Sequence, residues 1–336
     1  MSIYQSDPDA APDSEFEPGA LHHLVRGNAG RLLDPRRTPV TIVGLDLETG
    51  FMTLRVDRFE DAGATWDIPF EEVDHYQFAH GSRRASDEAV RRLRDVIERL
   101  DRALVIEPDP TDREVTEIRV DDDTTAAEGW LQDQSRFLAS GRRLPDPATR
   151  RGDELLMADL GSFMRERALW EVEEGFAQQY VRNPRAGEIV KGHRIVIAEL
   201  GLAPYAGTIV RDPATFAGGW SRERRAAHVR ARLGFLRALF ARLGLAQVEL
   251  WRGISADGLL RIDGGETLLS ASFDERVARS HLVAGPGRPT RRLLRGLVPT
   301  DRLFMTYLET AAMNDHYREA EAVLLAGRSA GPDPGL

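Results

Sequence analysis

Short runs of β-branched and aromatic residues alternate with polar positions over about residues 35–80. Turn signals at Glu48-Thr49-Gly50 and at Asp61-Ala62-Gly63 separate these runs, which is typical of neighbouring antiparallel strands. Four or five such strands predict a small β-barrel. Trp66 and Tyr76 lie within the runs; aromatic residues at strand spacing favour core positions, and a ligand-binding face is the alternative.

Apolar residues spaced by three and four positions predict three longer helices. The first begins at the capping residues Ser86 and Asp87 and reaches about Leu104. Its exposed face carries arginines that neighbouring acids balance, which favours a solvated face. The second helix covers residues 154–180. The third covers residues 221–243, where apolar side chains line one face and seven arginines cover the rest.

Two further segments are predicted as strands because they carry short runs of β-branched residues. They are residues 114–120 and residues 191–201. The run Asp121-Asp122-Asp123 is interpreted as an acidic turn rather than a metal site, because three consecutive side chains of a regular element cannot all face one ion. The Pro-, Gly- and Arg-rich segment 141–153 predicts a domain boundary.

Composition places the chain among ordinary soluble globular proteins. It has 336 residues, of which 42% are hydrophobic and 29% charged, so two or three domains are expected. The formal net charge of −9 argues against a general nucleic-acid coat. The absence of cysteine excludes disulfides, thiolate zinc sites and cysteine nucleophiles.

The N-terminal residues 1–20 are acidic and Pro-rich, which predicts a disordered tail. The segment lacks the basic start and apolar core of a secretory signal. The longest weakly charged stretch, residues 195–210, is interrupted by Glu199 and Pro204 and is too short for a membrane-spanning helix. We therefore expect a cytoplasmic protein without a membrane partner.

Three C-terminal pieces place polar or charged residues beside strongly apolar runs: V-E-L-W-R-G-I-S, T-L-L-S-A-S-F and Y-R-E-A-E-A-V-L-L. This pattern is typical of strands that present chemistry at their ends. In chain order the pieces supply Arg252, then Ser270 and Ser272, then Glu319 and Glu321. Because strand side chains alternate in direction, the two serines lie on one side of their strand.

The order and spacing of these residues resemble the arginine-serine-glutamate class of mono-ADP-ribosyltransferases, which includes many bacterial toxins. Eighteen positions separate Arg252 from Ser270 and 49 separate Ser270 from Glu319, and Ala271 stands where the family often has Thr. The resemblance covers about the last quarter of the chain. It implies an ADP-ribosyltransferase-like split β-sandwich with preceding helices, NAD as substrate and no metal.

The resemblance also implies a role for each residue. Glu321 would stabilise the cation that forms when nicotinamide leaves, Glu319 would act on the incoming nucleophile, and Ser270 would orient the catalytic carboxylate. A Glu at the position of Glu319 suggests a protein arginine as acceptor. The residues implied to bind NAD are Arg252, Gly253, Ser270, Ser272, Phe273, Arg288 and Arg291.

Several alternatives remain open at this point. Residues 301–325 also fit one long helix, in which Glu319 and Glu321 would be exposed acids. The basic segment 285–296 is either a loop over the cofactor phosphates or a solvated turn. The acceptor is alternatively RNA or DNA, which the Arg-rich helix at 222–242 and the basic loop at 288–295 motivate. A third hypothesis is a noncatalytic interaction protein with a toxin-like fold.

The sequence thus predicts an α+β protein with three parts. Residues 1–20 form the tail, and residues 21–145 form a module with a small SH3-like β-barrel and a helical segment that recognises a target or regulates access. Residues 150–336 form the catalytic domain. No Walker loop, H-E-x-x-H motif or histidine pair at metal spacing is present.

Overall fold

The computed structural model shows an α+β protein with antiparallel sheets and eight α-helices in its described part. The chain forms two compact units, residues 1–101 and residues 102–336, and each is described by itself. The described residues are 29–32, 38–46, 51–58, 62–69, 76–78, 91, 103–182, 184, 187–210, 213–256, 266–282, 290–315 and 318–326. The predicted N-terminal tail and nearly all of the predicted helix 86–104 lie outside them.

The first unit contains a five-stranded antiparallel sheet in the order β4-β3-β2-β1-β5. The strands are β1 (Ala29–Leu32), β2 (Pro39–Asp46), β3 (Phe51–Val56), β4 (Thr65–Pro69) and β5 (Tyr76–Phe78). Alternate residues of β2 and β3 are buried, as in a sheet with one face covered. The predicted barrel is wrong, because β4 and β5 are the two edges of an open sheet in the described residues. Trp66 and Tyr76 lie on these edge strands.

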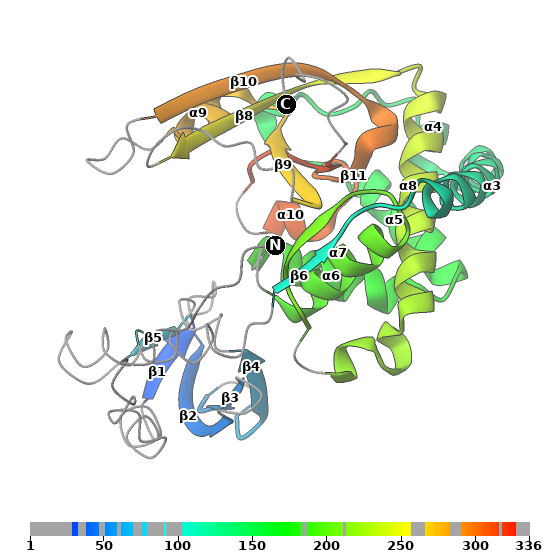
Figure 1. Cartoon of the computed structure of the whole chain (residues 1–336). Coiled ribbons are helices and arrows are strands. Elements are labelled where there is room, and N and C mark those ends of the chain that lie inside the picture. The colour runs from blue at the N-terminus through cyan, green and yellow to red at the C-terminus, as the bar shows by residue number, and fades with distance from the viewer. Residues whose placement is uncertain are drawn as a thin grey trace. The chain divides into compact units, whose positions relative to one another are not determined.

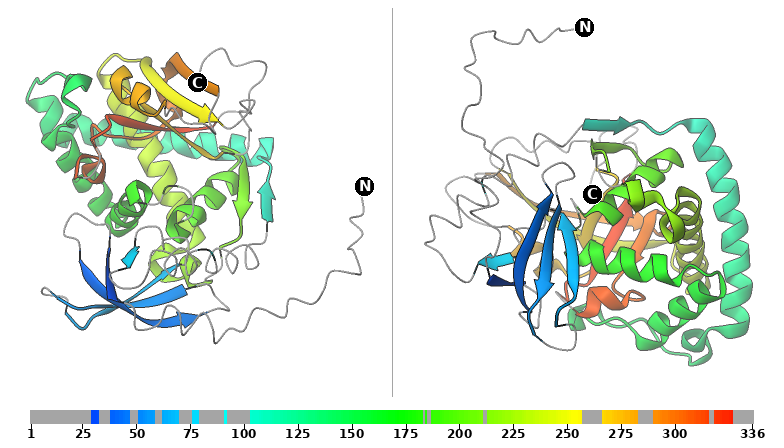
Figure 2. Two further views of the ribbon diagram at one scale, coloured as in Figure 1. Left: turned by 90° about the vertical axis from the view of Figure 1, so that its left-hand side faces the viewer. Right: turned by 90° about the horizontal axis from the view of Figure 1, so that it is seen from below.

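Most helices of the second unit pack against one another around α8, with the long helix α3 along its side, whereas α9 lies against the main sheet (Figures 1 and 2). They are α3 (Pro110–Gln134), α4 (Arg136–Ala139), α5 (Glu154–Glu166), α6 (Trp170–Arg182), α7 (Glu188–Glu199), α8 (Arg222–Arg242), α9 (Glu275–Ser280) and α10 (Ala311–Asp315). Single-turn 3-10 segments occur at Pro147–Thr149, Pro213–Phe216, Gly218–Trp220 and Thr300–Arg302. Within the described residues, no helix combines the length and the hydropathy needed to cross a membrane.

The helix predictions are confirmed in part. The third predicted helix corresponds to α8, and the second is divided into α5 and α6 by a turn at which Ala168 adopts a left-handed conformation. The strands predicted at residues 114–120 and 191–201 are wrong, because both segments are helical, in α3 and α7. The three aspartates at 121–123 belong to α3 rather than to a turn.

The main sheet of the second unit is antiparallel, in the order β10-β8-β9-β12-β11. Its strands are β8 (Gln247–Ala256), β9 (Leu268–Ser272), β10 (Thr290–Pro299), β11 (Leu303–Thr306) and β12 (Glu321–Leu325). A separate pair joins β6 (Ala103–Ile106) to β7 (Tyr205–Thr208). The three strands predicted around Arg252, the serines and the glutamates are confirmed. The single helix over residues 301–325 is wrong, and the segment predicted as a loop at 285–296 enters β10 at Thr290.

One hydrophobic core joins this sheet to the helices, and α8 runs through it. Leu233, Leu236 and Phe240 of α8 are fully buried, as the apolar pattern predicts. The arginines of α8 do not all cover an exposed face, however. Arg225 and Arg232 are also fully buried, which is tolerated because both are heavily hydrogen-bonded.

The segment 141–153, which the sequence analysis places at a domain boundary, lies inside the second unit. Asp153 N–H donates to the carbonyl of Leu308, and Gly152 N–H donates to Asn314 Oδ1. A Cβ on Gly152 would lie 2.1 Å from the carbonyl oxygen of Tyr307, so only glycine fits this contact. The Pro- and Gly-rich segment 141–153 is therefore a closely packed connection between α4 and α5.

Candidate active site

Three neighbouring strands bring the predicted residues together. Arg252 lies on β8, Ser270 on β9 and Glu321 at the first position of β12. In the strand register Glu321 is opposite Ser272, so Ser270 is its diagonal neighbour. Residues that are far apart in the chain are therefore adjacent because β9 lies between β8 and β12.

Glu321 has an unusual environment. Ser270 Oγ donates a 2.5 Å hydrogen bond to Glu321 Oε1, and the carboxylate is half-buried. The pKa of Glu321 is raised to about 7: burial is the main cause, the nearby charge of Glu319 adds to the rise, and hydrogen bonds from Ser270 and Tyr180 partly oppose it. A carboxyl group with this pKa changes its charge near neutral pH, which is common for catalytic acids and bases.

Ser272 holds the turn that carries Glu319. Its hydroxyl is buried, donates to the carbonyl of Glu319 at 2.6 Å and accepts from Asp274 N–H at 3.0 Å. Phe273 N–H donates to the carbonyl of Ala320, the next residue of the same turn. Ser272 thus fixes the backbone between the two glutamates.

The turn itself is strained on both sides of Glu319. Arg318 has φ 49° and Ala320 has φ 46°, in the left-handed region that side-chain-bearing residues seldom adopt. Such conformations cost about 1–3 kcal/mol each and persist where surrounding contacts enforce them. The bonds from the end of β9 supply that enforcement, so the two carboxylates are held in a defined arrangement.

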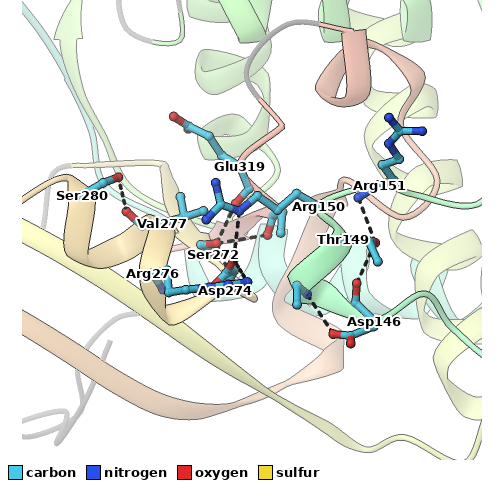
Figure 3. A network of polar contacts seen from close by, with 12 residues as sticks. Asp146, Thr149, Arg150, Arg151, Ser272, Asp274, Arg276, Val277, Ser280 and Glu319 are labelled. Carbon is cyan, nitrogen blue, oxygen red and sulfur yellow. Dashed lines mark hydrogen bonds and ion pairs between the residues drawn. The ribbon is translucent and has the colours of Figure 1, made fainter.

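Asp274 anchors the same region to the 141–153 segment (Figure 3). Arg150 Nε donates to Asp274 Oδ2 at 2.9 Å, and Arg276 also binds this carboxylate. Burial alone would raise the pKa of Asp274, but the hydrogen bonds from Arg276 and Arg150 outweigh it and hold the pKa below its usual range. The carboxylate therefore remains ionised and links the strand end to a distant part of the chain.

A hollow of about 380 Å³ opens beside Glu321, and we call it the larger hollow. Its charged or hydroxyl-bearing lining comprises Tyr180, Arg182, Arg194, Arg252, Glu266, Ser270, Glu319 and Glu321. Arg252 Nη2 donates to Glu266 Oε2 at 3.1 Å, so the predicted phosphate ligand already has a carboxylate partner. Tyr180 is buried at this wall, and burial raises its pKa well above the ordinary value.

Sequence reasoning missed the helical part of this lining. Tyr180 and Arg182 end α6, and Arg194 lies on α7. An arginine within an otherwise apolar run was the available signal for Arg194, but the run was interpreted as a strand. Glu266, just before β9, carried no signal of its own.

A second hollow of about 230 Å³, the smaller hollow, shares Arg252, Ser270 and the two glutamates with the larger one. Its other lining residues include Trp251, Gly253, Ser272, Val277 and His281. His281 Nε2 lies 3.6 Å from Glu319 Oε1. A Cβ on Gly253 would lie 1.9 Å from the carbonyl oxygen of Ala278, so this glycine allows α9 to approach β8 closely.

The remaining predicted site residues are placed elsewhere. Phe273 packs against Tyr307, with ring centroids 5.5 Å apart, and lines neither hollow. Arg291 is exposed on β10, opposite Ser255, and also lines neither hollow. Arg288 lies outside the described residues. Among the described residues no cluster of histidine and carboxylate side chains suits a metal ion.

The site therefore combines a carboxyl group that titrates near neutrality, a second carboxylate two residues away and cationic side chains, around two adjoining hollows. Such a set can bind an anionic substrate, stabilise a developing positive charge and accept a proton. Comparison with protein-family models, curated protein sequences and solved structures found no significant match to this chain.

Proposed function

We propose that the second unit is an NAD-dependent mono-ADP-ribosyltransferase that transfers ADP-ribose to a protein arginine and releases nicotinamide. The observation that carries the proposal is the hydrogen bond between Ser270 and Glu321, in a hollow that Arg252 and Glu319 also line. This is the residue set that the family resemblance requires at one site. The fold proposed with it is the ADP-ribosyltransferase-like split β-sandwich, of which the β10-β8-β9-β12-β11 sheet would be the catalytic half.

The first step would break the bond between the ribose anomeric carbon and the nicotinamide nitrogen. Its transition state resembles an oxocarbenium ion, so an ionised and oriented carboxylate nearby lowers the barrier. Glu321 would supply that charge, and Ser270 would orient it. The cationic nicotinamide ring of bound NAD would itself favour the ionised form, which offsets the raised pKa of Glu321.

The second step would join the anomeric carbon to a guanidinium nitrogen of the acceptor. A protonated guanidinium is a poor nucleophile, so a base must take up its proton as the new bond forms. Glu319 would take this proton and also attract the acceptor. The smaller hollow is the proposed acceptor entry, because Glu319 and Glu321 form part of its wall and His281 lies beside Glu319.

The charges of the residues at the site are compatible with binding of NAD. Arg252 would bind the pyrophosphate through its planar fork of donors, exchanging its bond with Glu266 for phosphate oxygens. The alternative of a nucleic-acid acceptor rests on the arginines of α8 and on the basic loop at 288–295, and the arginines of α8 are largely engaged within the protein. Two are fully buried, and Arg230 and Arg237 pair with acids of α3.

The test uses the full chain with adenine-labelled NAD and an arginine-rich acceptor protein, with nicotinamide release measured in parallel. We expect Glu321→Gln to abolish both label transfer and nicotinamide release. Glu319→Gln should abolish transfer while nicotinamide release continues by hydrolysis. Glu249→Gln is the matched control, because Glu249 is an exposed glutamate of β8 that pairs with Arg295. Nicotinamide release that persists in folded Glu321→Gln protein contradicts the proposal.

A further inference from the structure

Two arginines of the larger hollow lie on its helical wall. Arg194 lies in the middle of α7, and Arg182 is the last residue of α6. Both line the larger hollow. Neither has an ion pair or hydrogen bond to any residue that the structure describes; Arg182 is exposed, whereas Arg194 is half-buried and its Nε atom is buried.

The arginines that serve the fold are bound by protein groups. Arg225 donates to the carbonyls of Trp220, Ile189 and Thr215. Arg232 lies between Glu173 and Glu309, 3.1 Å from each carboxylate. Burying part of a guanidinium without such partners costs free energy, and arginine cannot escape the cost by losing its proton. The Nε atoms of Arg230, Arg232 and Arg237 are also buried without a hydrogen bond, but each of these arginines pairs with an acid. Arg194 has no such partner among the described residues, so we expect its guanidinium to bind a ligand in the hollow.

The larger hollow is lined by side chains of both charges. Burial is the main cause that raises the pKa of Tyr180; Glu321 and Glu266 add to the rise, whereas Arg194 and Arg252 oppose it. The Tyr180 hydroxyl therefore interacts electrostatically with both the acidic and the basic groups. A ligand that satisfies Arg194 without repelling Glu321 must carry its negative charge at the arginine side and leave an uncharged or cationic part beside the carboxylate.

We propose that Arg194, with Arg182, forms a diphosphate subsite on the helical wall of the hollow that Arg252 of β8 also lines. Its ligand class is a nucleoside diphosphate ester, and under the proposed function this is the pyrophosphate of NAD. Two phosphates present enough oxygens for two guanidinium forks, each of which binds phosphate oxygens in parallel pairs. The arginine of β8 alone, already engaged with Glu266, leaves this charge only partly compensated.

The test measures binding of ADP, ADP-ribose and adenosine to the full chain by isothermal titration calorimetry, without any turnover. We expect Arg194→Gln to weaken ADP and ADP-ribose binding about 10- to 100-fold, the loss typical of a charge-assisted hydrogen-bonding partner. Arg182→Gln should weaken binding less, and Arg194→Lys should recover part of the loss because it keeps the charge without the fork. Adenosine affinity should be unchanged.

Arg242→Gln is the matched control, because Arg242 ends α8 and donates only to Gln132 among the described residues. Circular dichroism establishes that each variant is folded, and if Arg194→Gln is not, Arg194→Lys and Arg182→Gln decide the question. Wild-type affinity for ADP in all folded hollow variants overturns the inference, as does a wild-type chain that binds no ADP. Arginine-dependent ADP binding without nicotinamide release supports the subsite and contradicts only the proposed transferase.

Discussion

The raised pKa of Glu321 implies that this residue destabilises the protein at neutral pH. Between pH 4.5 and about 7 the folded protein keeps a proton on Glu321 that the unfolded chain has already released. Because the folded state binds more protons there, stability falls as pH rises through this window. Glutamine has nearly the same shape and cannot ionise. We therefore predict that Glu321→Gln is more stable than the wild type above pH 7, and that its advantage disappears toward pH 4.5.

The magnitude follows from the size of the rise in pKa. Each tenfold change in acidity corresponds to about 1.36 kcal/mol, so a rise from 4.5 to about 7 corresponds to roughly 3 kcal/mol. Glu321 is only half-buried and faces an open hollow, so solvent screening reduces this to about 2 kcal/mol. The same substitution removes the proposed catalytic carboxylate, which makes this a case of stability exchanged for function.

The assay is urea denaturation of both proteins at several pH values from 4.5 to 8, followed by tryptophan fluorescence. Four of the five tryptophans lie in the second unit, so the signal reports mainly on this unit. The informative quantity is the difference in unfolding free energy between variant and wild type, because other titrating groups cancel. A difference that stays constant across this range refutes the reasoning. The control Glu249→Gln should show such a constant difference.

Three further predictions follow from the same structure. The kcat/KM for NAD, measured by nicotinamide release, should fall below about pH 7 as Glu321 is protonated. The midpoint of this fall should move to lower pH in Glu319→Gln and to higher pH in Ser270→Ala. A midpoint that stays in place in both variants would contradict the assignment of this titration to Glu321. Gly253→Ala should cost more than about 2 kcal/mol in urea denaturation, because its Cβ would lie 1.9 Å from the Ala278 carbonyl oxygen; an unchanged midpoint would mean that α9 moves freely. Arg232→Met should lower the free energy of unfolding by about 3–5 kcal/mol, because it leaves Glu173 and Glu309 buried without their cation. Substitution of the exposed Arg222 by Met should lower it by less than about 1 kcal/mol. Similar losses of stability for the two variants in thermal denaturation would refute this prediction.

Where local pattern and tertiary environment agree, the sequence predicted the structure. β9 and β12 were predictable because each is a short apolar run, and the polar residues at their ends stood out against it. Helix α8 was predictable from its apolar spacing. Ser270 and Glu321 could be paired in advance only through the family resemblance, since nothing in the local pattern gives the strand order.

Helix α7 shows why other predictions failed. Lys191 and His193 interrupt its apolar pattern, yet both are buried. Lys191 binds Glu188, and His193 Nε2 lies 3.2 Å from His228 Nδ1 on α8. A helix buried on most of its surface has no polar face, so its spacing loses the helical period and its β-branched residues favour a strand. The barrel prediction failed because closure of a sheet depends on whether its edge strands pair with each other, and the spacing of strands along the sequence does not determine this pairing.

The sequence by itself determined the chemistry available to this protein: two glutamates, a serine and an arginine at strand ends, and no thiol. Only the tertiary structure decided how that chemistry is used. The pKa of Glu321 depends on burial and on Tyr180 of α6, and the cationic wall depends on Arg194 of α7, which was predicted as part of a strand. The physical reason is that desolvation and charge interactions depend on distance in space, whereas local sequence patterns report only on neighbours along the chain.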